Sequence, residues 1–376
     1  MEGKEVQMNK LVLPGDILRA SEAIEMIPEV DLGPPIEVPP IPPEADPKNI
    51  PEEERKFLKS GIRSRKKEIG ALVLAHNYEP PDVQDEADFI GDSIHLAKIG
   101  RDSKKKVIVE AAVLFMPEML AVMKQPDQII LTPSRKALCS LAAHADVNKI
   151  LAWKHEHPKG KVISYVNTYL DVKAETDICC ASTNAAKVIQ YMAERHPDSP
   201  LLFLPDVFLG YFAMTVLKKM GRSTDNLWLM MGACHVHEKI TAHHVMRRMA
   251  LHPDAAVTAH PECGCVSKCS MLLDQGLVSE EMMQLRSTWG MLEFVKKTPA
   301  KKIIVATTVT NIYPMQKAAP DKEFIPANPE ARCAFMEQNT LRNLYESLRD
   351  MKHEITVDPE LAERAKIPIE RMLAIQ

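Results

Sequence analysis

The sequence predicts an α/β fold in which one unit, built from parallel strands and helices, occurs three times. Short apolar runs alternate with helical patterns along most of the chain, which is typical of parallel sheets with helices on both faces. Single cysteines also recur at nearly even intervals, at Cys139, Cys234 and Cys333. Because an even period indicates a repeated unit, we expect each unit to contribute one of these thiols.

Each predicted unit contains three recognisable strands, and the cysteine follows the last of them. The first strands are expected at residues 71–75, 162–164 and 255–259. The second strands are expected at 107–109, 201–204 and 303–306, and the last at 129–131, 227–230 and 324–325. Helical patterns lie between the second and last strands, around 117–123, 211–219 and 313–317.

Polar side chains follow the first strand of each unit. They are His76 and Tyr78 in the first unit, Tyr165 and Asn167 in the second, and His260 and Glu262 in the third. In parallel sheets, ligands gather beyond the carboxyl ends of the strands. These side chains are therefore candidates for one shared site.

Each unit then reaches a serine ahead of a helical pattern, at Ser93, Ser182 and Ser287. Serine is a favoured helix N-cap residue, so simple capping is one interpretation. A capped helix N-terminus that faces a cavity also binds carboxylates and phosphates, and the two roles can hold together. Ser287 follows its strand at a greater distance, which indicates an insertion of about ten residues within 268–281.

The composition is that of a soluble globular protein. The 376 residues are 45% hydrophobic and 26% charged, which suits two or three domains, and the net charge of −4 gives no indication of a nucleic-acid or membrane partner. The chain starts with charged residues, and its longest apolar stretch, 201–217, includes Pro205 and Asp206. Eight cysteines in a large chain without an export signal argue against a disulfide framework, so we expect reduced thiols and a cytoplasmic location.

The domain limits follow from the repeat and from the prolines. Residues 1–60 hold ten of the 28 prolines, which predicts an extended arm with at most one short helix at 17–27. Three αβα domains are expected at 61–141, 142–236 and 237–333. Residues 334–376 are expected to form a C-terminal helical segment, whose part 334–350 packs back on the first domain.

The spaced cysteines, Cys139, Cys234 and Cys333, suit an iron–sulfur cluster, which normally takes four cysteine thiolates. With three protein ligands, one iron keeps an open site and acts as a Lewis acid toward substrate oxygens. This arrangement favours a catalyst over an electron carrier.

A second group of cysteines, Cys263, Cys265 and Cys269, lies in one short stretch. Read alone, it resembles a zinc or redox site. It lies at the edge of the inferred insertion and outside the tripled pattern, so we rank it below the spaced cysteines. Cys179 and Cys180 are adjacent and are expected to pack in the core.

Five side chains are candidates for acid–base chemistry: His76, Tyr78, His237, His260 and Glu262. An isolated histidine is more often structural than catalytic, but these candidates cluster just past strand ends in different units. His260 and Glu262 lie two residues apart, and an extended chain sends such side chains to one side. A base beside a Lewis-acidic iron is suited to removing water, or a proton next to a carbonyl.

These residues resemble the quinolinate synthase family, the iron–sulfur enzymes of NAD biosynthesis. The resemblance spans roughly residues 65–350, in the right order, and is more specific than any single motif. The main matching segments are Leu-Ala-His-Asn-Tyr-Glu at 74–79, Phe-Met-Pro-Glu at 115–118, Tyr-Val-Asn at 165–167, Phe-Leu-Pro-Asp at 203–206, Gly-Ala-Cys-His-Val-His-Glu at 232–238, His-Pro-Glu-Cys at 260–263 and Ser-Thr at 287–288.

The resemblance implies three similar αβα domains about a pseudo-threefold axis, with one [4Fe–4S] cluster held by Cys139, Cys234 and Cys333. It implies condensation of iminoaspartate with dihydroxyacetone phosphate to quinolinate, with loss of phosphate and two waters. An iminoaspartate-producing enzyme would be a functional partner.

The resemblance also assigns roles to single residues. Tyr78, His237 and Glu262 would serve near the chemistry, with Glu262 as the proton-transfer base. The residues that would grip carboxylates and phosphate are His76, Ser93, Tyr165, Asn167, Ser182, His260, Glu262, Ser287 and Thr288.

The sequence departs from the family pattern in its proline-rich arm, in the insertion with three extra cysteines and at two shorter sites. Thr307-Thr308 stands where the family usually has Thr-Glu, and Glu110 begins a run that replaces a Cys-Gly-Val-like run. Two alternatives stay open. One is another three-cysteine cluster enzyme on the same tripled plan, such as the radical enzyme that begins diphthamide synthesis. The other is a zinc-stabilised binding protein that uses Cys263, Cys265 and Cys269.

Overall fold

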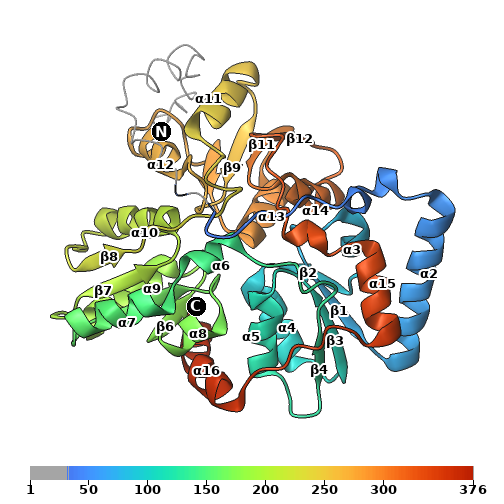
Figure 1. Cartoon of the computed structure of the whole chain (residues 1–376). Coiled ribbons are helices and arrows are strands. Elements are labelled where there is room, and N and C mark those ends of the chain that lie inside the picture. Colours follow the sequence, from blue (N-terminus) through green and yellow to red (C-terminus); the bar gives the residue numbers. More distant parts are fainter. Residues whose placement is uncertain (1–31, 33, 376) are drawn as a thin grey trace, which may run out of the picture.

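The computed structural model describes residues 32 and 34–375, and it contains three parallel four-stranded sheets arranged around a common centre (Figure 1). The first sheet has the order β2-β1-β3-β4, the second β6-β5-β7-β8 and the third β10-β9-β11-β12. The strand order is the same in all three, so the predicted tripled αβα fold is confirmed. The predicted helix at 17–27 lies outside the described residues.

The strands are short and mostly buried. Their bounds are β1 Leu72–His76, β2 Phe89–Gly91, β3 Val107–Ala111, β4 Ile129–Leu131, β5 Lys161–Tyr165, β6 Ile178–Cys180, β7 Leu201–Leu204, β8 Leu227–Leu229, β9 Ala256–Ala259, β10 Met283–Leu285, β11 Lys302–Ala306 and β12 Glu323–Pro326. The edge strands β2, β6 and β10 were not predicted. Each has only three residues, which is too short for an apolar pattern to stand out.

Helices cover both faces of each sheet. Those inside the repeats are α3 Pro81–Glu86, α4 Ser93–Asp102, α5 Phe115–Met123, α8 Leu170–Ala174, α9 Ala185–Arg195, α10 Val207–Lys219, α12 Val266–Asp274, α13 Thr288–Lys297 and α14 Ile312–Ala318. The others are α2 Glu52–Ile69, α6 Ser140–His144, α7 Val147–Glu156, α11 Ala242–Leu251, α15 Leu341–Asp350 and α16 Pro359–Ala374, with short 3-10 turns η1 Pro43–Ala45, η2 Pro47–Asn49, η3 Val309–Asn311 and η4 Met336–Gln338. Helix α12 is longer than its counterparts α3 and α8, which places extra residues of the third unit between β9 and β10.

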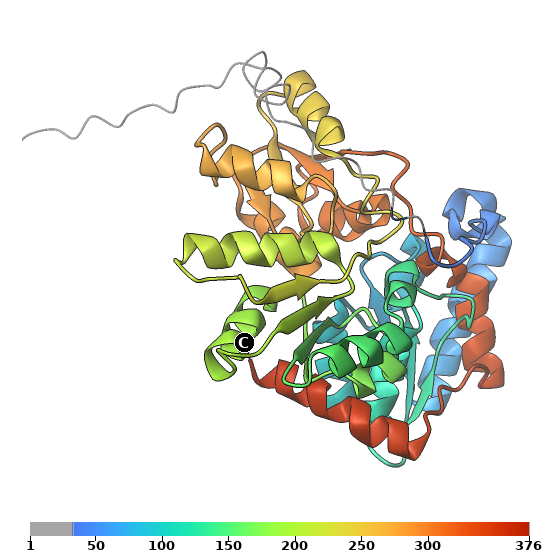
Figure 2. The ribbon, with the colours of Figure 1, turned by 60° about the vertical axis from the view of Figure 1, so that its left-hand side comes forward.

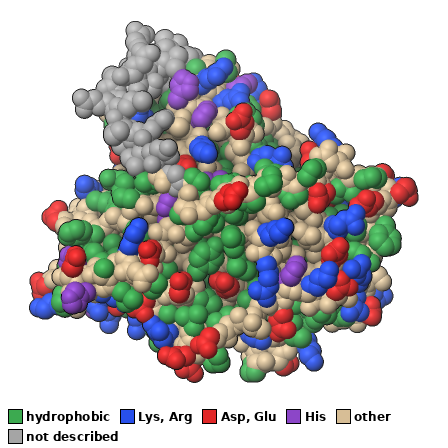
Figure 3. Space-filling view, viewed as in Figure 1, with side chains coloured by type: hydrophobic (Ala, Val, Ile, Leu, Met, Phe, Trp, Pro, Cys, Tyr) green, Lys and Arg blue, Asp and Glu red, His purple; other side chains and the backbone are tan. Residues whose placement is uncertain are grey.

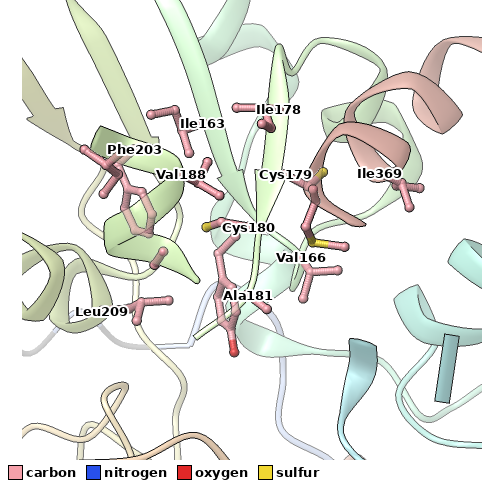
Figure 4. Packing of buried hydrophobic residues seen from close by; sticks show 14 of the residues in the cluster. Ile163, Val166, Ile178, Cys179, Cys180, Ala181, Val188, Phe203, Leu209 and Ile369 are labelled. Atoms are coloured by element: carbon pink, nitrogen blue, oxygen red, sulfur yellow. The ribbon is translucent and has the colours of Figure 1, made fainter. Parts of the chain in front are cut away.

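The sheets are buried on both faces because their strands are continuous apolar runs. In the second sheet, Ile163 of β5 and Phe203 of β7 belong to the same apolar cluster as Cys179 and Cys180 of β6, and Ile369 of α16 packs on this cluster (Figure 4). Both cysteines are fully buried, as expected from the sequence. Acidic and basic side chains are interspersed over the face of the molecule shown in Figure 3.

The two C-terminal helices pack on different units. Helix α15 lies along α2, as both views show, and the ring of Tyr345 packs against Gly61 (Figures 1 and 2). Helix α16 packs on α8 and β6 of the second sheet. Helix α2 crosses residue 60, where the sequence placed the end of the arm. The predicted domain limits stay predictions.

The described part of the proline-rich arm lies against the globular part of the molecule. Ile36 and Val38 pack on the apolar cluster that also includes Cys139 and Cys333. The side chain of Gln338 donates a hydrogen bond to the Pro40 carbonyl at 3.0 Å. None of the helices in the described part of the chain combines the length and apolar character that a membrane crossing requires.

Candidate active site

A cavity of about 740 Å³, counting the space at its mouth, lies where the three sheets meet. Side chains from all three units line it, at the carboxyl ends of their strands. The predicted site residues among them are His76, Tyr78, Ser93, Cys139, Tyr165, Asn167, Ser182, Cys234, His237, His260, Glu262, Thr288 and Cys333.

The spaced cysteines reach this cavity from loops that follow the last strand of each sheet. Cys139, Cys234 and Cys333 are all partly exposed. The loop of Cys234 passes so close to the second sheet that a β-carbon on Gly232 would lie 2.6 Å from the Pro205 carbonyl oxygen. Glycine therefore permits this approach and brings the thiol to the cavity.

The chemistry of these thiols suits a cationic ligand larger than one ion. Burial raises the pKa of Cys139 and of Cys333 to about 12, so both stay protonated unless a cation favours the thiolate. A tetrahedral zinc ion would need sulfurs roughly 3.8 Å apart, from Zn–S bonds of about 2.3 Å. Within the described residues, only the group of His237, His260 and Glu262 has ligand atoms that all lie within 4.8 Å of one another. At least two of the three cysteine sulfurs therefore lie farther apart than 4.8 Å.

A chain of hydrogen bonds crosses the cavity wall between the first and third units. The Tyr78 hydroxyl lies 3.1 Å from the Thr288 hydroxyl and 2.7 Å from the Thr307 hydroxyl. Thr307 in turn lies 3.1 Å from Nε2 of His237. Because each member is buried and bonded to the next, this chain can hold or pass a proton.

Glu262 lies next to His237 at the end of this chain and contacts the second unit. One of its oxygens lies 3.2 Å from Nδ1 of His237, and the other accepts a hydrogen bond from the Tyr165 hydroxyl. Burial alone would raise the pKa of Glu262, but His260, His237 and Tyr165 outweigh burial and lower it to about 2. Burial would lower the pKa of His237, but Cys234 and Glu262 raise it to about 10. The carboxylate is therefore ionised although it is buried.

His76 and His260 occupy equivalent turns at the ends of β1 and β9. Nδ1 of His76 accepts a hydrogen bond from the Tyr78 amide at 3.1 Å, and Nδ1 of His260 accepts one from the Glu262 amide at 3.4 Å. Burial lowers the pKa of His76 to about 3 and that of His260 to about 4, so both rings are neutral. In a neutral ring with Nδ1 as acceptor, Nε2 carries the proton and is a donor.

The three predicted capping serines differ in the structure. Ser287 caps α13, with its hydroxyl accepting from the Gly290 amide at 3.3 Å, and it is absent from the cavity lining. Ser93 and Ser182 do not cap. Asp92 caps α4 in place of Ser93, because its carboxylate accepts from the His95 amide at 3.0 Å. In the second unit the N-cap position of α9 falls on residue 184, beyond Ser182. Both hydroxyls therefore stay available at the cavity.

Three polar side chains of this region were missed by sequence reasoning. Thr307 directly follows β11, so the strand-end rule that selected His260 could have found it. Ser140 and His235 each follow a spaced cysteine, and no local pattern marks them. Thr308 lines the cavity where the family usually has an acidic residue, and its hydroxyl lies 3.0 Å from that of Thr310.

The local cysteines lie elsewhere. Cys263, Cys265 and Cys269 are fully buried in the apolar cluster of the third unit, and none of them lines the cavity. The Cys263 thiol donates to the Ala306 carbonyl at 3.2 Å. Burial raises the pKa of Cys263, which keeps that thiol protonated. This trio is a set of core side chains.

Comparison with known proteins gives one consistent result. The family described as quinolinate synthetase A protein matches residues 60–374. A quinolinate synthase of Pyrobaculum aerophilum is 40% identical over 316 residues, which is 84% of this chain and 99% of the relative. That of Thermus thermophilus is 39% identical over 310 residues, with 82% and 94% covered, and that of Mycolicibacterium paratuberculosis is 39% identical over 314 residues, with 84% and 87% covered.

Proposed function

Because the chain belongs to the quinolinate synthase family of enzymes, we propose that it condenses iminoaspartate with dihydroxyacetone phosphate to form quinolinate, with loss of phosphate and two waters. The observation that carries this proposal is the single cavity that gathers thiols, imidazoles and one ionised carboxylate from three units. A cytoplasmic location and a partner enzyme that supplies the imine belong to the same proposal.

The residues that would hold a [4Fe–4S] cluster are Cys139, Cys234 and Cys333. They fit the group because three half-buried thiols surround one cavity and are more widely spread than a single ion requires. When bound through three cysteines, the cluster supplies one iron with an open site, which acts as a Lewis acid toward a substrate oxygen.

Substrate anions would be held by donors that the fold aims at the cavity. His76 and His260 offer Nε2–H groups, and Tyr165 and Asn167 offer further polar atoms beside them. The hydroxyls of Ser93 and Ser182 are free of capping, and the N-terminus of α13 brings Ser287 and Thr288, whose amides and dipole favour carboxylate or phosphate.

Proton transfer would centre on Glu262. Its carboxylate is held by Tyr165 and lies beside the imidazole of His237, so it can take a proton from a carbon next to an imine or carbonyl. His237 and Tyr78 are linked through Thr307 and can return a proton to a departing oxygen. Buried surroundings keep bulk water away from these transfers.

Neither alternative gains support. The family match favours quinolinate synthase over the diphthamide-type enzyme. The cysteines of the zinc hypothesis lie in an apolar core outside the cavity.

The direct test is anaerobic incubation of the iron-loaded protein with the two substrates, with quinolinate measured by chromatography. We expect quinolinate and inorganic phosphate in equal amounts. A protein that carries about four irons and four sulfides per chain but forms no quinolinate would contradict the proposal, as would cleavage of S-adenosylmethionine.

A further inference from the structure

We propose that His235 is a positioning residue that clasps together the three loops carrying Cys139, Cys234 and Cys333. This inference rests on the proposed function, because it concerns the residues that would hold the cluster. His235 lies in the segment 232–238 that resembles the family, but the resemblance assigns it no role.

The contacts of His235 reach all three loops. The residue directly follows Cys234 in the chain. Its Nδ1 lies 2.7 Å from the hydroxyl of Ser140, and its backbone amide donates to the same hydroxyl at 3.4 Å. Ser140 directly follows Cys139, so a hydrogen bond joins the neighbours of two predicted ligands from different sheets.

The third loop is reached through an aromatic contact. The His235 ring packs edge-on against the ring of Phe335, with centroids 5.3 Å apart and planes at 89°. Phe335 lies two residues beyond Cys333. Edge-to-face packing has a preferred geometry, so it orients the loop as well as burying surface.

The clasp is built from buried groups. Only 7% of His235 is exposed, and 1% of Ser140 and of Phe335. Nε2 of His235 is buried and has no hydrogen-bond partner among the described residues, and His235 lines the cavity. Nε2 of His235 is thus a second polar atom of the clasp, and it can form a hydrogen bond with a group bound in the cavity.

A clasp of this kind has a specific consequence. The three thiols lie on loops from separate sheets, and no covalent bond between these loops fixes the distances between the thiols. Residues just behind metal ligands fix ligand orientation, and their loss typically weakens metal retention or activity by about 10–100-fold. We therefore expect the Ser140–His235 bond to govern how firmly the cluster is held.

The test compares Ser140→Ala, His235→Asn and the double variant. Each protein is loaded anaerobically with iron and sulfide, and iron release to a chelator is followed by absorbance, together with the electron paramagnetic resonance spectrum of the reduced protein. We expect Ser140→Ala, which loses both hydrogen bonds to the Ser140 hydroxyl, to release iron about 10–100-fold faster. The double variant should release iron at least as fast, since it also loses the edge contact with Phe335. His235→Asn alone should keep part of the iron retention, because its amide can bond Ser140 from the place of Nδ1, although it loses the ring contact with Phe335.

His157→Ala is the matched control. That ring also makes one hydrogen bond, to the Trp153 carbonyl, and one edge contact, to Trp228, and it stacks on the Trp153 ring, but it lies away from the cysteine loops. Circular dichroism of the unloaded chain checks folding, and Ser140→Ala, which removes one oxygen, carries the test if His235→Asn fails to fold. Unchanged iron release and spectrum in Ser140→Ala, or equal effects in His157→Ala, would overturn the clasp alone. Failure of the unsubstituted protein to take up iron and sulfide would overturn the proposed function and the clasp together.

Discussion

Cysteines and glutamates occur both at the central cavity and inside the three units, but those at the cavity differ from the others in exposure or in ionisation. Cys139, Cys234 and Cys333 come from three units and are half-exposed at the cavity. Cys263 and Cys265 come from one loop and are completely buried in the core of one unit. Closeness along the sequence would therefore select the buried cysteines, whereas the topology of the repeat selects the ones that line the cavity.

The same contrast holds for two buried glutamates. Glu262 at the cavity is ionised because His260, His237 and Tyr165 surround it. Glu110 on β3 has no hydrogen-bond partner for its Oε2, and burial raises its pKa to about 8. A buried carboxyl group stays ionised where partners from several units surround it, and it stays protonated where it lies within one sheet without such partners. Each comparison can be tested by making the same change in both regions.

The largest effect is expected from Cys234→Ala. Loss of one of three cluster ligands should abolish both bound iron and quinolinate formation, because two thiols cannot hold the cluster. Iron, sulfide and turnover are measured under anaerobic conditions. Cys265→Ala is the control and should keep all three, so equal loss in both variants would refute the distinction between the two trios.

Glu262→Gln should lower kcat by about 10²–10⁴-fold, the usual contribution of a positioned base. Glutamine keeps the size of the side chain and its contact with Tyr165, so the iron content should stay unchanged. Steady-state kinetics with both substrates measure the effect. Glu110→Gln makes the identical chemical change away from the cavity, and a comparable loss of kcat there would show that the effect is structural.

Glu110→Gln should instead change the pH dependence of stability. The folded chain keeps a proton on Glu110 up to about pH 8, whereas the unfolded chain loses it near the ordinary pKa of 4.5. The unfolded state thus binds fewer protons in this window, so the free energy of unfolding falls as pH rises from 4.5 to 8. The variant should lack this slope and be more stable by about 1–3 kcal/mol at pH 7.5. Denaturant titrations of both unloaded proteins at pH 5 and 7.5 measure the free energy of unfolding. An equal change of that free energy between the two pH values in both proteins would contradict the prediction.

The smallest effect is expected from Cys265→Ala on stability. Removing one buried sulfur leaves a small cavity in the third unit and should cost about 1 kcal/mol of unfolding free energy, as is usual for single core changes. Denaturant unfolding of the unloaded chain gives this value. A loss of bound zinc together with complete unfolding would instead revive a metal role for the local cysteines.

Much of this fold could be predicted because a buried parallel strand is a continuous apolar run. Residues such as Leu74 and Phe203 mark their strands plainly. The strand-end rule then placed His76, Tyr165 and His260 at one site, where the structure has them. Capping was wrong for Ser93 and Ser182, because a neighbouring residue holds the N-cap position and propensity alone does not decide between neighbours.

The remaining features depend on pairs that only the tertiary fold brings together. The Ser140–His235 bond joins residues 95 positions apart, and the contact of Tyr78 with Thr307 joins residues 229 apart. No local pattern encodes such pairs. The low pKa of Glu262 likewise arises from side chains of two different units, so it could not be derived from the His-Pro-Glu motif by itself.

The most direct test of the central claim is anomalous X-ray scattering, at the iron absorption edge, from crystals of anaerobically loaded protein. We predict one compact iron peak in the cavity, bonded to the sulfurs of Cys139, Cys234 and Cys333. An iron-free cavity in active crystals, or a metal peak at Cys263, Cys265 and Cys269, would contradict the account.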